Sequence, residues 1–299
     1  MSTFVIYHAH CADGLTAASI YKFVHSRKNI TYIEGSYNKT LEEYPDFTDA
    51  EVIFLDFSFK EKEFRSLLQV AKSITVVDHH ITAYEYLHKI KEEDNVFNTY
   101  IFDNDECGSS LTFKWLMPKT PLPLAIEYIK DQDIYRWLYK EDSVPFCLFI
   151  ETLNTDLETF LSHWIEILMC SNHITKPTKY IDIGKTLLKL RNNYVNIIKE
   201  KYQVIKYLDL DIIVVNCPSI FTNQVSDQFR DNSEYHYVIT YSICKKGYSF
   251  SLRSSKGYST LPITLSISEK GGGHVNASGA FLSHQDFEKH PLKKLLIGL

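Results

Sequence analysis

Short apolar runs alternate with longer segments of helical periodicity through the first half of the chain. The runs are rich in β-branched and aromatic residues, which is typical of strands, and at least ten residues separate one from the next. This alternation predicts an α/β fold, a mostly parallel sheet with helices on its faces. The predicted strands are residues 4–7, 31–33, 51–55, 74–77 and 98–102.

The second half of the chain begins with one long helical pattern and continues with further strand-like runs at 210–215, 235–243 and 248–254. A chain of 299 residues is long enough for two hydrophobic cores. We therefore predict a first domain over 1–175, a connecting helix over 176–206 and a smaller α/β domain over 207–299.

The composition, with 44% hydrophobic and 23% charged residues, is that of an ordinary globular protein. The net charge of −5 argues against long duplex DNA as a partner, because proteins that follow long nucleic acids neutralise many phosphates with Lys and Arg. A small anionic ligand, bound by local positive charge, is the better expectation.

The six cysteines are scattered without a C-x-x-C pair, so we predict neither a zinc cage nor a disulfide framework. The first residues lack the basic start and apolar stretch of a signal peptide, and no apolar run is long enough to span a membrane. We expect a cytoplasmic protein with no membrane partner.

Polar residues that can bind metals or transfer protons follow three of the predicted strands. Parallel sheets bind ligands beyond the carboxyl ends of their strands, because loops from several strands converge there. Carboxylate and imidazole groups together suit a pair of transition-metal ions, which can clamp a phosphate and activate water. The residues after the first, third and fourth strands are His8, His10, Cys11, Asp13, Asp56, Asp78, His79 and His80.

A single aspartate after a strand is more often a helix cap than a catalytic group, so no one position decides the matter. The run Asp78-His79-His80 is stronger, because a buried strand rarely ends in three ionisable groups without a function. Asp131 and Asp133 follow another apolar stretch. Either could complete a ligand set, and a solvated acidic turn is the alternative.

In the second domain, Gly271-Gly272-Gly273-His274 is too short for a dinucleotide-binding or Walker motif. Three glycines can present backbone N–H groups to an anion, although glycine runs are more often flexible turns. Arg253 shares a strand face with two serines, so it either binds a phosphate or faces water.

Together these segments resemble the DHH phosphoesterase superfamily, specifically its small members with the DHH-associated C-terminal domain. The four motifs occur in the family's order and extend over nearly the whole chain. They are residues 11–17, Asp56, Asp78-His79-His80 and 271–279.

The resemblance implies two Mn²⁺ ions, with Asp56 bridging them and with Asp13 and His79 on one ion. One further acid completes the ligand set, and we assign that role to Asp131, with Asp133 as the second choice. The catalytic residues implied are Asp78, which orients its neighbours or binds metal, His79, and His80, which lies beside the metals or the phosphate. The substrate-binding residues implied are Arg253, Gly271, Gly272, Gly273, His274 and Asn276.

The first motif departs from the family pattern, because Cys11 stands where the family usually has an aspartate. The upstream ligand is either His8 or His10, and the spacing does not decide between them. Mg²⁺, Co²⁺ or Zn²⁺ are alternatives to Mn²⁺. Since sulfur is a softer ligand than oxygen, Cys11 as a ligand would shift the preference toward zinc or iron.

We therefore predict a hydrolase that cleaves phosphodiester or terminal phosphate bonds of short oligonucleotides or small nucleotides. Within the same superfamily, a cyclic dinucleotide phosphodiesterase or an exopolyphosphatase-like enzyme is the alternative. A non-catalytic nucleotide-binding relative, with Cys11 marking a lost metal, is the alternative of another class. A homodimer is possible in either case.

Overall fold

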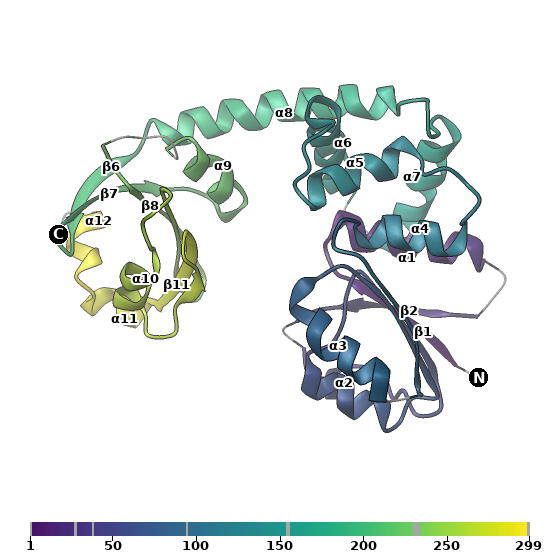
Figure 1. Ribbon diagram of the computed structural model, residues 1–299. Coiled ribbons are helices and arrows are strands. Elements are labelled where there is room, and N and C mark those ends of the chain that lie inside the picture. Colours follow the sequence, from purple (N-terminus) through teal and green to yellow (C-terminus); the bar gives the residue numbers. More distant parts are fainter. Residues whose placement is uncertain are drawn as a thin grey trace. The chain divides into compact units, whose positions relative to one another are not determined.

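The computed structural model describes residues 2–26, 29–37, 39–93, 95–153, 156–229 and 234–297 (Figure 1). The chain divides into two compact units, Met1–Leu188 and Lys189–Leu299. Each unit has its own sheet and its own hydrophobic cores. None of the helices in the described ranges combines the length and the apolar character needed to cross a membrane.

Five parallel strands form the sheet of the first unit, in the order β2-β1-β3-β4-β5, which confirms the predicted parallel sheet. The three strands β1, β3 and β4 are neighbours, so the residues that follow them meet at one edge of the sheet. The strands are β1 (Thr3–His8), β2 (Thr31–Gly35), β3 (Glu51–Leu55), β4 (Ser73–Asp78) and β5 (Phe97–Phe102).

Helices pack on this sheet in two separate cores, because alternate strand residues point to opposite faces. Leu55 and Val77 belong to the core with α1, α4, α5, α6 and α7, whereas Phe54 and Val76 belong to the core with α2 and α3. The helices are α1 (Ala12–Val24), α2 (Glu61–Leu68), α3 (Ile81–Glu93), α4 (Gly108–Leu116), α5 (Leu124–Asp133), α6 (Lys140–Thr152) and α7 (Leu157–Met169), with a short 3-10 turn at Leu41–Glu43.

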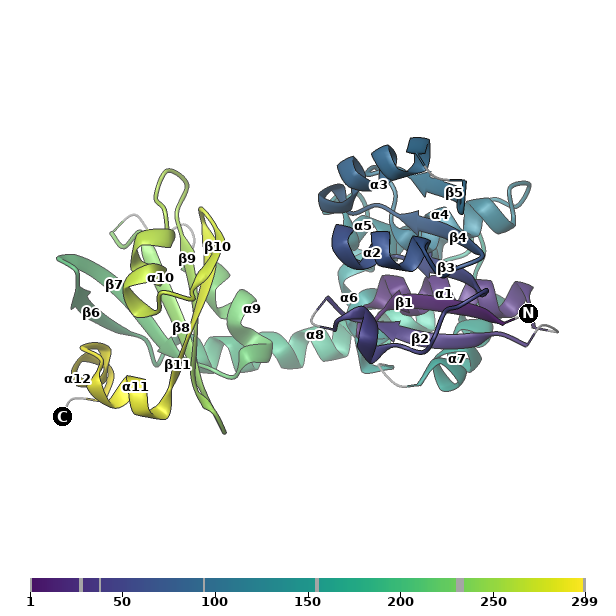
Figure 2. The same ribbon diagram turned by 90° about the horizontal axis from the view of Figure 1, so that it is seen from below.

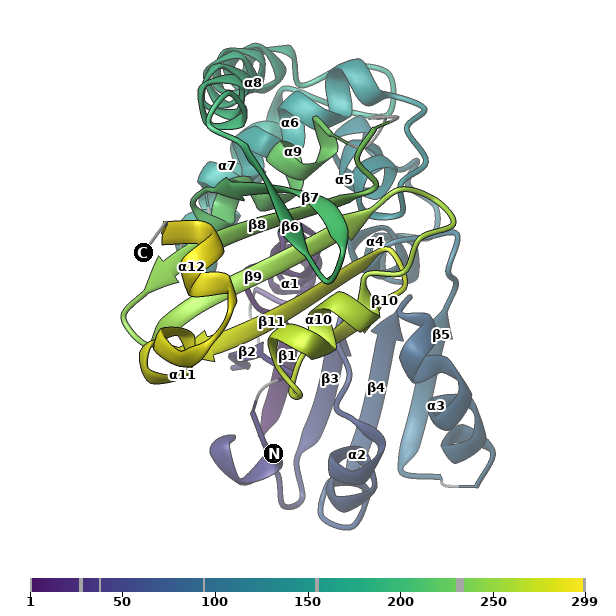
Figure 3. The same ribbon diagram turned by 90° about the vertical axis from the view of Figure 1, so that its left-hand side faces the viewer.

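The second unit is built on a mixed sheet of six strands in the order β10-β11-β9-β8-β7-β6 (Figure 3). Only β7 and β8 pair in parallel, and the other neighbours are antiparallel. The strands are β6 (Gln203–Tyr207), β7 (Leu210–Asn216), β8 (Tyr237–Cys244), β9 (Gly247–Ser254), β10 (Gly272–His274) and β11 (Ala277–Ser283).

Helices also pack on the second sheet, which confirms the predicted smaller α/β unit (Figure 2). Phe250 and Leu252 of β9 share one core with α10 (Leu261–Ile267), α11 (His284–Lys289) and α12 (Leu292–Ile297). Val238 of β8 belongs to a second core with α9 (Thr222–Asp227), and a short 3-10 turn, Ser219–Phe221, precedes α9.

The long helix α8, Thr178–Lys199, ends earlier than the helix predicted over 176–206. The reason is that residues 203–207 form β6, in which Ile205 and Tyr207 are buried and their neighbours are exposed. That alternation is the period of a strand, which a helical interpretation of the segment overlooks.

The packing of α8 on α6 leaves no room for a side chain at Gly184. A Cβ atom there would lie 1.8 Å from the carbonyl oxygen of Pro145. We predict that Gly184→Ala destabilises the protein by about 1–3 kcal/mol, as overpacking does. This is opposite in sign to the gain of about 1 kcal/mol that the same change gives in an exposed helix.

Urea unfolding followed by far-UV circular dichroism measures the effect. Thr186→Ala, at an exposed position two residues along the same helix, is the matched control and should change stability by less than about 0.5 kcal/mol. A Gly184→Ala variant as stable as the wild type would show that α6 and α8 do not pack this closely.

Candidate metal centre

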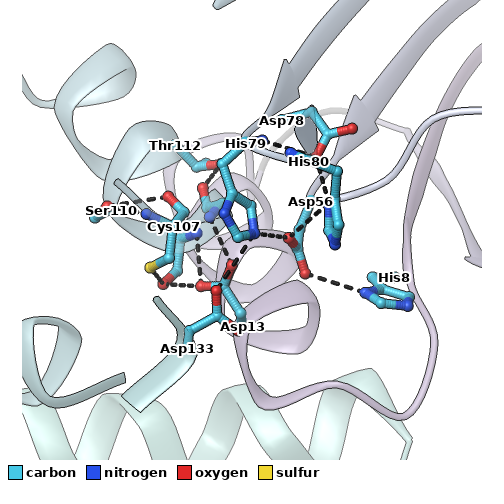
Figure 4. A network of polar contacts seen from close by, with 12 residues as sticks. His8, Asp13, Asp56, Asp78, His79, His80, Cys107, Ser110, Thr112 and Asp133 are labelled. Atoms are coloured by element: carbon cyan, nitrogen blue, oxygen red, sulfur yellow. Dashed lines mark hydrogen bonds and ion pairs between the residues drawn. The ribbon is translucent and has the colours of Figure 1, made fainter. Parts of the chain in front are cut away.

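Acidic and imidazole side chains from adjacent strands converge at the carboxyl edge of the first sheet (Figure 4). His8 is the last residue of β1, Asp56 directly follows β3, and Asp78 is the last residue of β4. The parallel pairing of β1 with β3 and of β3 with β4 places these strand ends side by side. The sequence prediction that the polar strand ends meet is therefore confirmed by the strand order.

Asp56 lies at the middle of this cluster. Its side chain is 1% exposed, and neither carboxylate oxygen has a hydrogen-bond partner among the described residues. Oδ2 lies 3.4 Å from Nδ1 of His8, and Oδ1 lies 3.2 Å from Nε2 of His79. The two oxygens thus face different groups without being satisfied by them, as the oxygens of a carboxylate that bridges two cations would.

The backbone of Asp56 adopts the left-handed region, with φ of 56°. This conformation is uncommon for residues other than glycine, although Asp and Asn tolerate it better than most. It turns the chain sharply after β3, while the amide N–H of Asp56 donates to the carbonyl oxygen of Val77 (2.9 Å). Strained backbone of this kind is concentrated at functional sites.

Three overlapping groups of ligand atoms surround Asp56 and His79. In each group the atoms lie within 4.8 Å of one another, which is close enough for one cation to contact them all. Asp56 belongs to two of the groups, and its two carboxylate oxygens could serve adjacent cations, whereas Nε2 of His79 could bind only one. The groups are His8 with Cys11 and Asp56, Asp56 with His79 and His80, and Asp13 with His79 and Asp133.

Asp78 orients the two histidines that follow it. Its Oδ1 accepts hydrogen bonds from the backbone N–H groups of His79 (2.8 Å) and His80 (3.2 Å) and lies 2.7 Å from Nδ1 of His80. Burial lowers the pKa of His80, but the bond to Asp78 and the nearby negative charges outweigh it and raise that pKa to about 9.

Residues at the N-terminus of α4 form hydrogen bonds to the side chain of Asp13. They were not among the site residues predicted from the sequence. The backbone N–H of Gly108 donates to Oδ2 of Asp13 (2.5 Å), and the N–H and hydroxyl of Ser109 donate to Oδ1 (2.9 and 2.5 Å). A side chain at Gly108 would place Cβ 2.4 Å from Cβ of Asp56, so only glycine lets the helix approach this closely. The sequence feature that could have identified these residues is the run of small residues at 108–110, shortly after β5.

A buried ion pair joins α4 to α5. Glu106, which precedes α4, accepts from Lys130 of α5 (2.5 Å), from Lys114 (2.7 Å) and from Ser110 (2.7 Å). Lys130 is buried, so its charge is neutralised by Glu106 rather than by water. Because Asp133 is the last residue of α5, this pair fixes α5 relative to the helix that holds Asp13.

The cluster is rich in negative charge. Burial and the charge of Asp13 raise the pKa of Asp56 well above its ordinary value, although His8 acts in the opposite direction. Burial and Asp13 likewise raise the pKa of Asp133 to about 7, against the effect of His79 and His80. Burial and these carboxylates also raise the pKa of Cys11. A cation placed among these groups would relieve their mutual repulsion.

The structure separates the alternatives that the sequence left open. His8 lies in the cluster, whereas His10 is exposed in the loop before α1. Asp133 lies in the cluster, whereas Asp131 accepts from the backbone of Leu138 (2.6 Å), the backbone of Tyr139 and the hydroxyl of Ser143. The geometry therefore favours the second choice, Asp133, because its carboxylate lies within 4.8 Å of the ligand atoms of Asp13 and His79, whereas Asp131 belongs to none of the three groups.

The predicted substrate-binding residues lie in the second unit. Arg253 of β9 and His274 of β10 both pair with Ala277 of β11, so they share a row across one face of the sheet. Arg253 donates to Oδ1 of Asn223 (2.6 Å) and lines a cavity of about 250 Å³. The glycines 271–273 and His274 lie in and beside the short strand β10, whose three residues are all exposed.

Asn276, the remaining predicted substrate-binding residue, has a structural contact set. Its amide nitrogen donates to the hydroxyl of Ser254 (2.9 Å) and to the carbonyl oxygens of Ser255 (3.0 Å) and Tyr258 (2.8 Å). The side chain thus fastens the 254–258 loop, which lies directly after Arg253.

The chain is similar in sequence to the uncharacterized protein R106 of Acanthamoeba polyphaga mimivirus. The two are 28% identical over 304 aligned residues, which cover 93% of this chain and 67% of that protein. No protein-family model matches the sequence.

Two solved structures share the architecture of the chain. Exonuclease RecJ bound to manganese matches with a TM-score of 0.54 and 12% identity, over 99% of this chain and 89% of RecJ. The pGpG-specific phosphodiesterase PggH from Vibrio cholerae matches with a TM-score of 0.52 and 12% identity, over 99% of this chain and 97% of PggH. The chain therefore shares the fold of these two proteins, which is the kind of fold that the resemblance of its motifs to the DHH phosphoesterase superfamily implies.

Proposed function

We propose that this protein is a metal-dependent phosphohydrolase that cleaves phosphodiester bonds in short oligonucleotides or small nucleotides. The observation that carries the proposal is the buried carboxylate of Asp56, whose unpaired oxygens face His8 on one side and His79 on the other. Burying an ionised carboxylate without a partner costs free energy, and a bound cation would offset that cost.

The donor set fits divalent ions of intermediate hardness. His79, Asp13 and Asp133 offer one nitrogen and two carboxylates, and His8 with Asp56 offers a second position. Mixed imidazole and carboxylate ligands suit Mn²⁺, with Mg²⁺, Co²⁺ or Zn²⁺ as alternatives. The sulfur of Cys11 beside His8 is a soft group, which would shift the preference of that position toward Zn²⁺ or Co²⁺.

Two divalent ions, when bound, would stabilise the charge on the phosphate oxygens and activate a water molecule for in-line attack. The chain's own residues position these components. Asp78 holds the ring of His80 through Nδ1, which leaves the other ring nitrogen to donate a proton to a phosphate oxygen or to the leaving group. Gly108 and Ser109 fix the carboxylate of Asp13 so that it cannot rotate away.

The substrate class is inferred from charge and from the structural neighbours. RecJ is an exonuclease and PggH is a phosphodiesterase specific for pGpG, so two proteins with this fold act on nucleotide phosphodiesters. The net charge of −5 favours short substrates over long duplexes. In the second unit, Arg253 and His274 are the candidate groups for holding the substrate's anionic part.

A non-catalytic nucleotide-binding protein is the competing proposal, and Cys11 in the metal centre is the feature that favours it. Hydrolysis of bis(p-nitrophenyl) phosphate with Mn²⁺ separates the two, because a binding protein releases no nitrophenol above the buffer rate. Dinucleotides, short RNAs and cyclic dinucleotides, with products identified by mass, then define the substrate.

We predict that Asp56→Asn lowers the Mn²⁺-dependent rate roughly a thousandfold or more, because a carboxamide cannot bridge two cations. In EDTA the same variant should be at least as stable as the wild type, because the substitution removes a buried carboxylate that the charge of Asp13 repels. Activity on bis(p-nitrophenyl) phosphate and thermal unfolding with and without Mn²⁺ are the two measurements.

Asp49→Asn is the matched control, because Asp49 also has φ of 56° but is exposed and lies outside the cluster. It should retain both the activity and the stabilisation by Mn²⁺. Full activity of Asp56→Asn, or equal Mn²⁺ stabilisation of both variants, would contradict the proposed metal centre.

The raised pKa of Asp133 predicts a pH dependence of stability for the protein in EDTA. Between the unfolded pKa of about 4 and the folded pKa of about 7, the folded state binds a proton that the unfolded state does not. Stability from this group is therefore present at low pH and is lost as the pH rises toward 7. Asp133→Asn should remove that loss.

The measurement is the melting temperature of both proteins in EDTA at pH 5 and pH 7. The melting temperature of the variant minus that of the wild type should be a few degrees larger at pH 7 than at pH 5. If the difference in melting temperature between the two proteins is the same at pH 5 and pH 7, the pKa of Asp133 is not raised by the neighbouring carboxylates.

A further inference from the structure

Asp133 differs from Asp13 in how its side chain is held. Oδ2 of Asp133 is buried, lies 3.3 Å from Nε2 of His79 and has no hydrogen-bond partner among the described residues. Asp13, by contrast, accepts hydrogen bonds from backbone N–H groups at the start of α4. The direction of the Asp133 side chain (Figure 4) therefore depends on the backbone of α5, of which Asp133 is the last residue.

The backbone directly after Asp133 is held in an uncommon conformation. Tyr135 and Trp137 both adopt the left-handed region, with φ of 55° and 57°. Bulky residues disfavour this region, because Cβ comes too close to the backbone. Tyr135 is 74% exposed and Trp137 is 40% exposed, so burial of their rings contributes little to offset the strain. Polar contacts elsewhere must hold the segment in this shape.

The carboxylate of Asp131 supplies such contacts at the far end of the segment. Asp131 is 1% exposed and accepts from the backbone N–H groups of Leu138 (2.6 Å) and Tyr139 (3.1 Å) and from the hydroxyl of Ser143 (2.6 Å). Hydrogen bonds to a carboxylate are stronger than those between neutral groups. Tyr139 and Ser143 lie at the start of α6, whose N-terminus also favours a negative charge. Asp131 thus ties the end of α5 to the start of α6 across the strained residues.

We propose that Asp131 is a positioning residue, which sets the affinity of the metal position formed by Asp13, His79 and Asp133 without contacting the ion itself. The inference rests on the proposed function, of which it names a further residue. By fixing residues 134–139, Asp131 fixes the backbone from which Asp133 reaches the cluster. Replacing a group that orients a metal ligand from outside typically lowers metal affinity about ten- to a hundredfold.

Asp131→Asn tests the proposal with little change in side-chain size. An amide accepts at only one of the two oxygen positions, and its NH₂ group would face hydrogen-bond donors at the other. Equilibrium binding of Mn²⁺, followed by the electron paramagnetic resonance of the free ion, should show one site weakened roughly ten- to a hundredfold and the other unchanged. Ser143→Ala, which removes one of the three contacts, should weaken the same site less.

The dependence of hydrolysis on Mn²⁺ distinguishes a positioning residue from a metal ligand. With bis(p-nitrophenyl) phosphate, Asp131→Asn should need more Mn²⁺ for half-maximal activity but should recover most of the wild-type kcat at saturating Mn²⁺. Asp133→Asn should keep a low kcat at every Mn²⁺ concentration, because it removes the ligand itself. A kcat for Asp131→Asn as low as that of Asp133→Asn would overturn the proposal, since Asp131 would then act as a ligand.

Backbone hydrogen exchange in EDTA tests the structural route without metal or substrate. Asp131→Asn should speed amide exchange in residues 134–139, because local exchange reports how firmly a segment is held. Ile90→Val is the control for a general loss of stability, since Ile90 is buried in the core with α2 and α3, and it should leave the Mn²⁺ affinity unchanged. Wild-type exchange of residues 134–139 in Asp131→Asn would overturn the proposal.

The binding and activity measurements separate this proposal from the proposed function. If Mn²⁺ binds but no phosphodiester is hydrolysed, the proposed function fails, whereas weaker Mn²⁺ binding by Asp131→Asn still supports the inference. Equal Mn²⁺ affinities of the wild type and Asp131→Asn would overturn the inference whatever the activity. If the wild type binds no Mn²⁺, both fail.

Discussion

Mutual repulsion among three buried or nearly buried carboxylates, those of Asp13, Asp56 and Asp133, is the constraint on which the rest of the first unit depends. Like charges placed together in a low-dielectric site must be held by surrounding structure or neutralised by a cation. The parallel sheet brings Asp56 to the site, α1 brings Asp13, and the end of α5 brings Asp133. The fold thus gathers carboxylates whose negative charge favours bound protons or, under the proposed function, bound cations.

Each of these groups is restrained from a different direction. The amides at the start of α4 hold Asp13, a left-handed backbone turns Asp56 toward the cluster, and the pair Glu106–Lys130 ties α5 to the segment before α4. Helix N-termini favour anions because their N–H groups are unpaired, so α4 stabilises the charge that α1 brings to the site. The positions of the three carboxylates therefore depend on α4 and α5, which follow the last strand of the first sheet, as much as on the strand ends.

The sequence was sufficient for the parallel sheet, the smaller α/β second unit and the meeting of the strand ends, because β-branched runs and polar strand ends are local signals. It did not decide between His8 and His10, since they are two residues apart and only the backbone path after β1 sets which ring points inward. It favoured Asp131 over Asp133, because a one-dimensional pattern does not show that Asp131 caps its own turn. Gly108 and Ser109 were not recognised, since their partner Asp13 lies about a hundred residues away.

The second unit shows the same limit. The alternation of Ile205 and Tyr207 was hidden by the helical pattern before it, and the short strand β10 was interpreted only as a glycine run. Asn276 carries part of a family motif, yet its amide fastens the loop after Arg253, so a shared motif can record a folding requirement as well as a contact with substrate.

The left-handed backbone at position 56 has a consequence for interpreting relatives of this chain. Asn accepts that conformation about as readily as Asp, and Gly accepts it more readily, whereas β-branched residues do not. A descendant that loses catalysis can therefore replace the carboxylate by Asn or Gly and keep the turn, the sheet and the overall resemblance intact. Under the proposed function, the residue type at this single position distinguishes chains that keep the proposed metal ligand from chains that have lost it, which likeness of fold does not.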